Sequence, residues 1–364
     1  MEKYKNICEL VNIKSFDENQ NSEIINYLEQ RFATCKQIAK IKNDDNNIYN
    51  LVVGINTNLK NINNAIILSG HIDTVVADEK NYKTNPYQAT LVDDKIYGLG
   101  VIDMKCFFAS ILDNLEFLKK QTTPIIVCIT GDEETNLQGI NKISQFFKQQ
   151  NITPKFTLVG EPTSLGFCTK SKSCFEYSIE VYGKSCHSSN PQNGINSNYI
   201  CAKLINFIEK MAKKQKNTTL SCNIMQGGEK VNIVSSYAKI TFDIRSPQKK
   251  CADNCIKKIT AKAKKLEAKY QGCKIEITNN LCIPALENKS QKLVDKILKK
   301  YNQTATEFIG GCEAGYFCEL GGESIIFGAG DLELAHKPNE FLDINNYQKY
   351  NKMFADIVSE ICKN

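Results

Sequence analysis

The chain has 364 residues and a mass of 41.0 kDa, which is compatible with two domains of roughly 100–200 residues each. A hydrophobic fraction of 42% and a charged fraction of 24% are ordinary for a globular protein and exclude a disordered or fibrous chain. The net charge is +6, but only two basic residues are Arg and the lysines are spread along the chain, so no nucleic-acid partner is expected.

Strands and helices alternate in the first 160 residues. Residues 3–35 favour helix, with a break near residues 12–19, and residues 48–53 favour a strand. Short apolar runs then predict buried strands, and apolar residues at helical spacing predict the helices between them. The predicted strands are residues 65–68, 124–130 and 156–159, and the predicted helices are residues 104–118 and 140–147. This alternation indicates an α/β domain with a mainly parallel mixed sheet flanked by helices.

The middle of the chain has a different pattern. Apolar residues alternate with period two from residue 175 to residue 181, as in a sheet with one solvated face. The further elements expected there are helices at 198–213 and 251–269 and strands at 231–244 and 273–277. We therefore expect an inserted α+β domain over residues 172–283, within a domain formed by residues 1–171 and 284–364. A helix at 290–301 and a strand at 324–327 return the chain to the first domain.

Sixteen cysteines raise the question of a disulfide-rich secreted protein or a redox or metal-storage protein. Both classes are disfavoured, because no C-x-x-C occurs and the closest pair, Cys251 and Cys255, lies one helical turn apart. The N-terminal residues carry charges throughout, and no stretch reaches the roughly 18 apolar residues of a membrane span. We expect reduced thiols, a cytoplasmic location and no membrane partner.

The three histidines lie in distinctive local contexts. His71 directly follows a predicted buried strand, His187 follows the period-two strand, and His336 comes shortly after Gly328-Ala329-Gly330. Sites in α/β folds lie just beyond the carboxyl ends of parallel strands. In His71-Ile72-Asp73 an extended backbone lets Asp73 reach the imidazole and fix its tautomer. A lone H-x-D is a weak signal, since a loop histidine beside an aspartate is common.

Carboxylates follow the next strands along the chain, and they strengthen the signal. Asp103 precedes a predicted helix, Glu133 and Glu134 follow the strand ending at Thr130, and Glu161 follows the next strand. Taken alone, Asp103 could cap a helix and Glu161 could belong to an ordinary turn. Carboxylates gathered at neighbouring strand ends repel one another unless cations bind there. Two histidines and three or four carboxylates suit two zinc-like ions with one bridging carboxylate, an arrangement used for hydrolysis.

A series of motifs from about residue 65 to residue 345 resembles a known family, the two-zinc deacylases and carboxypeptidases that include aminoacylase and succinyl-diaminopimelate desuccinylase. In order, the motifs are SGHIDT, YGLGVIDMKCFFA, TGDEET, VGEPTSL, GKSCHSSNPQNGINS, FDIRSP, CEAG and GAGDLELAHKPNEF. The resemblance implies a catalytic domain and an inserted ferredoxin-like lid and dimerisation domain. It also implies two Zn²⁺ per subunit, with Co²⁺ as a substitute.

The resemblance implies a role for each residue of the strand-end cluster. His71 and Glu161 would hold one zinc, Glu134 and His336 the other, and Asp103 would bridge them. Asp73 would orient His71. Glu133 would be the general base that takes a proton from water and returns it to the leaving amine.

Two residues of the inserted domain also match the family. His187 would stabilise the oxyanion, often from the partner subunit of a homodimer; the alternative is a surface histidine. Arg245 would bind the α-carboxylate of the substrate with its planar fork, and the alternative is a salt bridge at a strand edge. Three positions depart from the usual pattern, because Cys106, Cys186 and Cys312 replace two glycines and a threonine. None is a proposed ligand, but they could bring sulfur close to the metals.

Within this family the motifs are most similar to those of acetylornithine deacetylases. That similarity implies release of acetate from N2-acetylornithine, a step of arginine synthesis. N-succinyl-diaminopimelate, another N-acyl amino acid or a small peptide remain alternative substrates, because specificity is set mostly by loops. A non-catalytic binding protein on the same fold is a further alternative, although Glu133 and all the implied ligands are present.

Overall fold

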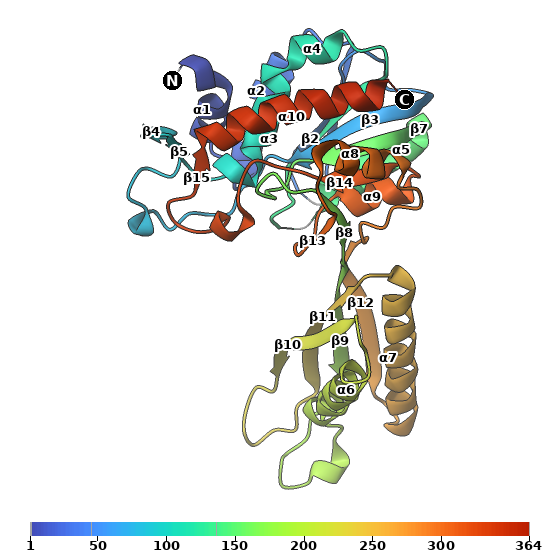
Figure 1. Cartoon of the computed structure of the whole chain (residues 1–364). Helices are drawn as coiled ribbons and strands as arrows, with labels where there is room; N and C mark the ends of the chain where they lie inside the picture. The colour runs from blue at the N-terminus through green and yellow to red at the C-terminus, as the bar shows by residue number, and fades with distance from the viewer. Residues whose placement is uncertain (1, 45, 136, 364) are drawn as a thin grey trace. The chain divides into compact units, whose positions relative to one another are not determined.

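The computed structural model describes residues 2–44, 46–135 and 137–363. The chain divides into two compact units (Figure 1). Unit 1 comprises Met1–Ser171 and Leu286–Asn364, and unit 2 comprises Lys172–Ala285. Among the described residues, no helix is long and apolar enough to cross a membrane.

Unit 1 is built on an eight-stranded mixed sheet with the strand order β1-β2-β6-β3-β7-β14-β8-β13. The strands are β1 (Gln37–Lys42), β2 (Tyr49–Gly54), β3 (Ile62–His71), β6 (Ile125–Thr130), β7 (Ile152–Val159), β8 (Cys168–Ser171), β13 (Thr306–Phe308) and β14 (Glu323–Ile326). The four central strands, β6, β3, β7 and β14, run parallel to one another. Their carboxyl ends therefore lie at one edge of the sheet.

Helices cover both faces of this sheet. They are α1 (Lys5–Asn12), α2 (Glu18–Arg31), α3 (Cys106–Asp113), α4 (Leu115–Lys119), α5 (Gln138–Gln150), α8 (Lys292–Tyr301), α9 (Ala314–Glu319) and α10 (Ile344–Cys362). Helices α1, α2, α3 and α10 share one apolar core with Ile66 and Leu68 of β3. Ile67 between them is also fully buried, which requires a cover on the other face. Helices α5 and α9 lie together, with the rings of Phe147 and Phe317 5.9 Å apart.

A small three-stranded sheet completes unit 1. Its strands are β4 (Thr90–Val92), β5 (Lys95–Tyr97) and β15 (Phe341–Asp343), in the order β15-β5-β4. β15 comes from the far end of the chain and pairs antiparallel with β5. The sheet thereby joins the segment that precedes Asp103 to the segment that follows His336.

Unit 2 has a four-stranded antiparallel sheet in the order β10-β11-β9-β12. Its elements are β9 (Ser173–Tyr182), α6 (Ser197–Ala212), β10 (Thr219–Gly227), β11 (Tyr237–Ser246), α7 (Lys249–Lys269) and β12 (Lys274–Ile283). This βαββαβ order is the ferredoxin-like arrangement. The helices pack onto the sheet through a separate apolar core that includes Leu204, Ile240 and Ile259.

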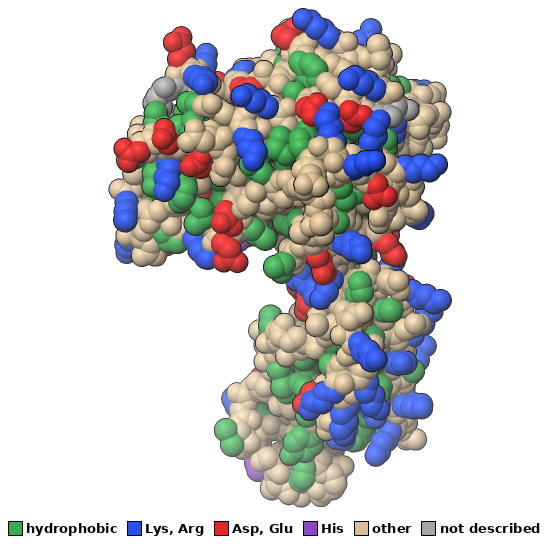
Figure 2. All heavy atoms as spheres, viewed as in Figure 1, with side chains coloured by type: hydrophobic (Ala, Val, Ile, Leu, Met, Phe, Trp, Pro, Cys, Tyr) green, Lys and Arg blue, Asp and Glu red, His purple; other side chains and the backbone are tan. Residues whose placement is uncertain are grey.

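The predicted fold class, a mainly parallel mixed sheet with a separate smaller α+β domain, is confirmed. The strand expected at 231–244 is instead β11, which begins at Tyr237, and β10 was not predicted. The lysines of α7 form a solvated helix face, with Lys257, Lys258 and Lys265 exposed. In Figure 2, Lys and Arg side chains are scattered over unit 1 among acidic ones and gather along α7 in unit 2.

Candidate metal centre

The parallel strands bring four site residues of unit 1 to one edge of the sheet. His71 is the last residue of β3, and Glu161 lies just beyond the end of β7. Glu133 and Glu134 follow β6, on the other side of β3. Because β6, β3 and β7 are neighbours, residues that are up to 90 positions apart in the chain face a common point.

Glycine precedes two of these residues because the strand ends pack closely against α3 and the segment before it. A Cβ atom on Gly160 would lie 2.1 Å from the ring of Phe107, and one on Gly70 would lie 2.0 Å from the methyl carbon of Met104. Either substitution would push apart the strand end and its cover. Glycine at these two positions therefore allows the strand ends that carry His71 and Glu161 to pack closely against Met104 and Phe107.

Asp103 lies between the two histidines of the cluster. Its Oδ1 atom is 3.0 Å from Nε2 of His71, and its Oδ2 atom is 3.3 Å from Nε2 of His336. It lies in the turn Val101–Lys105, where Asp103 and Met104 have non-helical φ and ψ angles, and the Asp103–Met104 peptide bond is cis. Asp103 does not cap the following helix, because Lys105 occupies the N-cap position of α3. Each carboxylate oxygen thus faces a different imidazole, as a bridging ligand requires.

His336 reaches the cluster from a loop after β14. Its φ of 58° is in the left-handed region, which is uncommon for a residue with a side chain. Its Nε2 atom is 2.8 Å from Oε1 of Glu134. The His336 side chain is 52% exposed, against 1% for His71. The two histidines therefore define a buried half and an open half of the cluster.

Asp73 contacts both His71, at the end of β3, and the segment that follows β6. Its carbonyl oxygen is 3.0 Å from Nδ1 of His71, and its carboxylate Oδ1 is 3.5 Å from the same nitrogen. The carboxylate also accepts hydrogen bonds from the backbone N–H groups of Glu133, at 3.2 Å, and Glu134, at 2.9 Å. A proton on Nδ1 leaves Nε2 of His71 as the coordinating nitrogen.

Burial makes the charges of this cluster costly. Burial raises the pKa of Glu161 well above its usual value, and the nearby Asp103 carboxylate raises it further. Burial likewise raises the pKa of Glu133 to about 8, although His71 opposes that shift. Hydrogen bonds to two carboxylates raise the pKa of His336 to about 10. In the absence of cations, protons on these groups reduce the repulsion, and bound divalent cations would take their place.

Within the described part of the chain, three overlapping groups of side chains have donor atoms within 4.8 Å of one another, as a metal ion needs. They are His71, Asp103 and Glu161; His71, Glu133 and Glu134; and Asp103, Glu134 and His336. Imidazole nitrogens combined with carboxylate oxygens are donors that suit zinc and similar divalent cations. Asp103 belongs to two groups, so the residues present fit a pair of cations that share one carboxylate.

Sequence reasoning left without a role two buried glutamates that contact the segments carrying the cluster. Glu340 is 2% exposed, and its carboxylate accepts hydrogen bonds from the backbone of the Asp103 segment. Glu313 is fully buried and accepts hydrogen bonds from the hydroxyls of Ser69 and Thr130, near the ends of β3 and β6. Glu313 occurs in the motif CEAG and Glu340 in the motif GAGDLELAHKPNEF. Their presence in these motifs was the available signal.

His187 and Arg245 belong to unit 2 and are described within it. His187 is exposed, and its Nδ1 atom is 2.8 Å from the hydroxyl oxygen of Ser189. Arg245 lies on β11, where its Nε atom donates to Asp243 Oδ2 at 2.9 Å. A salt bridge on the strand is therefore present, and the guanidinium has further N–H groups that can donate to a carboxylate.

The departures at cysteine positions add no sulfur ligand among the described residues, since none of the candidate metal groups contains a cysteine. Cys106 and Cys312 are buried, and burial raises the pKa of both thiols, which keeps them protonated. Cys186 lies in unit 2, where its thiol contacts the carbonyl oxygen of Asn190 at 3.3 Å.

Comparison with known proteins places this geometry in context. The acetylornithine deacetylase of Buchnera aphidicola subsp. Schizaphis graminum is 28% identical over 380 residues, covering 99% of this chain and 97% of that protein. The acetylornithine deacetylase of Aliivibrio fischeri is 30% identical over 342 residues, covering 90% and 88%. Both alignments extend over nearly the whole length of the chain.

Solved structures share the fold at lower identity. An aminopeptidase of Bacillus cereus has a TM-score of 0.77 at 20% identity, covering 99% of this chain and 98% of that one. A dinuclear metal-binding peptidase of Bacillus subtilis has a TM-score of 0.69 at 16% identity, covering 99% and 97%. The model of peptidase family M20/M25/M40 matches residues 67–360. The chain is therefore a member of peptidase family M20/M25/M40, a family of dinuclear metallohydrolases.

Proposed function

We propose that this protein is a zinc-dependent amide hydrolase that removes the acetyl group from N2-acetylornithine, giving ornithine and acetate for arginine synthesis. The observation that carries the hydrolase chemistry is the position of Asp103 between His71 and His336, with carboxylates on both sides. The choice of substrate is supported by the names of the two relatives described above, which align over nearly the whole chain.

In this proposal His71 and Glu161 hold one zinc ion, Glu134 and His336 hold the other, and Asp103 is shared. When bound, the ions would polarise the amide carbonyl and make water more acidic; Co²⁺ is an expected substitute. Asp73 orients His71 from one side through Nδ1, and it holds the backbone of the Glu133–Glu134 pair from the other.

Glu133 is the proposed general base. It lies beside Glu134. Its carboxylate belongs to one of the three candidate metal-binding groups, together with Glu134 and His71. Its carboxylate takes a proton from the attacking water and later delivers that proton to the leaving amine nitrogen, so the reaction consumes one water and leaves the enzyme unchanged.

The proposed roles in unit 2 are recognition and charge stabilisation. Arg245 binds the α-carboxylate of the substrate through guanidinium N–H groups. The exposed imidazole of His187 donates a hydrogen bond to the oxyanion that develops on the carbonyl oxygen.

We also propose a homodimer that forms through unit 2. The support is the edge strand β10, which exposes Ile224 and Met225, at 52% and 49%. An exposed edge with apolar side chains is suited to pairing with a second chain. A reducing compartment, the cytoplasm, agrees with the finding that all sixteen cysteines are free thiols.

A second candidate is hydrolysis of a small peptide or of another N-acyl amino acid, including N-succinyl-diaminopimelate. The aminopeptidase of Bacillus cereus that shares the fold motivates this alternative, because the cluster itself does not select the groups on either side of the amide bond.

The test compares substrates on one protein preparation. Metal-stripped protein is assayed for ornithine release from N2-acetylornithine with and without added Zn²⁺, in parallel with N-succinyl-diaminopimelate and a dipeptide. Zinc-dependent release from the acetyl substrate alone would support the proposal. Zinc-dependent hydrolysis of only one of the other compounds would keep the metal centre and assign that compound as the substrate instead. Protein that binds no zinc would overturn the metal centre.

A further inference from the structure

Glu340 is a buried acid whose carboxylate is directed at backbone rather than at another side chain. Its Oε2 atom accepts a hydrogen bond from the N–H of Gly100 at 2.9 Å, and its Oε1 atom accepts one from Ile102 at 2.8 Å. Oε1 is also 3.4 Å from the N–H of Asp103, and the carbonyl oxygen of Glu340 accepts from Gly98 at 3.2 Å. One residue therefore satisfies most of the donors in the turn that presents Asp103.

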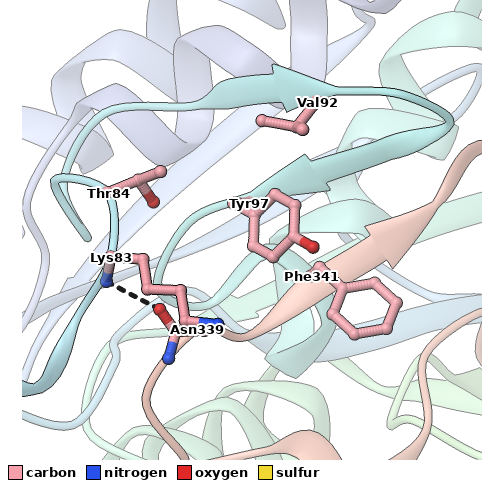
Figure 3. A pocket seen from close by; sticks show the side chains of 6 residues that line it. All are labelled: Lys83, Thr84, Val92, Tyr97, Asn339 and Phe341. Atoms are coloured by element: carbon pink, nitrogen blue, oxygen red, sulfur yellow. Dashed lines mark hydrogen bonds between the residues drawn. The ribbon is translucent and has the colours of Figure 1, made fainter.

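The position of Glu340 is itself fixed by its two neighbours in sequence. Phe341 begins β15 and is paired in register with Tyr97 of β5. Asn339 accepts a hydrogen bond from the backbone N–H of Lys83 at 2.7 Å, with a left-handed φ of 66°. Figure 3 shows both neighbours from the side of a pocket of about 290 Å³, with the Lys83–Asn339 bond drawn. Glu340 is held from both sides and has little freedom to move away from the turn.

This arrangement joins the segments that carry two residues of the cluster. His336 lies four residues before Glu340, and Asp103 lies in the turn that Glu340 holds. The Asp103 carboxylate faces Nε2 of His336 at 3.3 Å and Nε2 of His71 at 3.0 Å. A shift of the turn would move Asp103 relative to both imidazoles, and ligand geometry tolerates deviations of only about 0.2 Å.

We propose that Glu340 is a positioning residue that fixes the place of the shared carboxylate Asp103. It thereby determines how tightly the cation in the open half of the cluster, between Glu134 and His336, is held. The inference rests on the proposed metal centre. Residues behind the ligands that orient them typically contribute 10–100-fold in metal affinity. Loss of the carboxylate acceptors would leave the donors of Gly100 and Ile102 unpaired and release the turn.

The test is Zn²⁺ binding to metal-free protein, measured by competition with a chromophoric chelator and independent of catalysis. In Glu340→Gln an amide NH₂ replaces one acceptor and faces a backbone donor. We expect the dissociation constant of the weaker Zn²⁺ to rise about 10–100-fold, with a smaller change for the tighter Zn²⁺, whose other ligands, His71 and Glu161, are buried at strand ends.

Glu323→Gln is the matched control. Glu323 is also buried, at 7% exposed, and its carboxylate accepts backbone hydrogen bonds from Leu293 at 2.8 Å and Val294 at 3.0 Å, at the start of α8. We expect this variant to lose stability and to bind both Zn²⁺ ions as the parent does. Equal weakening in Glu323→Gln and Glu340→Gln would show a general effect of destabilisation and would overturn the proposal.

Glu340→Asp keeps the charge but shortens the reach, and it decides the matter if Glu340→Gln does not fold. Weaker binding of one Zn²⁺ in folded Glu340→Asp would support the proposal. Parent-like affinity for both ions in a folded Glu340 variant would overturn it. Parent protein that binds fewer than two Zn²⁺ ions would instead overturn the metal centre, and the inference with it.

Discussion

The two halves of the candidate metal centre are built differently. His71 extends from the end of a central strand and its side chain is 1% exposed, whereas His336 lies on a loop and its side chain is 52% exposed. His71 also belongs to two of the three candidate donor groups and His336 to one. The buried half is fixed by the sheet, and the open half depends on contacts between loops. We therefore expect the cation in the open half to be held less tightly and to exchange faster.

The largest expected effect concerns Glu133, which lies beside both halves. Glu133→Gln removes the proton acceptor but no proposed ligand of either ion, so we expect kcat to fall by about three or more powers of ten while two cations stay bound. Metal analysis and steady-state kinetics measure both quantities. Glu333→Gln is the control, since that side chain is 86% exposed on the His336 loop and should retain activity. Unchanged turnover in Glu133→Gln would remove Glu133 from the base role.

Replacing the histidines separately tests the comparison directly. His336→Ala should retain about one cation per chain after dialysis, because His71, Asp103 and Glu161 stay in place. His71→Ala should retain less than one, since it disrupts two donor groups. Elemental analysis of the dialysed proteins gives the metal content. If His336→Ala lost more metal than His71→Ala, the assignment of a tight buried half would be wrong.

Arg245 allows the buried half of the centre to be compared with unit 2. The proposed site residues there are exposed, as His187 is, or paired with a neighbour on the same strand, as Arg245 is with Asp243. Arg245→Lys keeps the charge but loses the planar fork, so we expect KM to rise about tenfold with a smaller change in kcat. Lys239→Ala is a suitable control, because Lys239 lies on the same strand and pairs with Glu180 at 3.2 Å. A loss confined to kcat would contradict a role in ground-state binding of the substrate carboxylate.

The last prediction concerns stability rather than activity, and it involves Glu313, which supports the buried half through Ser69 and Thr130. Burial raises the pKa of Glu313 to about 7, so the folded state holds this proton more tightly than the unfolded state does. Its contribution to stability is therefore present at low pH and is lost as the pH rises from about 4.5 to about 7, by about 3 kcal/mol at most.

Urea unfolding of metal-free protein across that pH range measures this contribution. Glu313→Gln lacks the titrating group, so its stability should fall less between pH 4.5 and 7 than that of the parent. Parallel pH profiles for the two proteins would show that Glu313 titrates as it does in the unfolded chain.

Local sequence patterns predicted the buried half of the centre better than the contacts that support it. His71 and Glu161 directly follow apolar strands, so their meeting at one edge follows from parallel topology. The contact between Glu340 and Gly100 spans 240 residues, so the motif GAGDLELAHKPNEF could single out Glu340 but could not show which segment it contacts. Strand β10 was missed for a related reason, since most of this edge strand is exposed and it lacks a buried apolar stripe.

The insertion of unit 2 between β8 and α8 has a consequence for synthesis on the ribosome. Unit 2 is one continuous segment, so it can fold as soon as it has emerged, before unit 1 is complete. The sheet of unit 1 is completed later, because β14 can pair with β7 only after Glu323–Ile326 has been translated. Until then β7 has an open edge. His336 and Glu340 emerge later still. The candidate metal centre is therefore complete only after His336 and Glu340 have emerged, and a chain cut short within unit 2 has a nascent sheet but no complete centre.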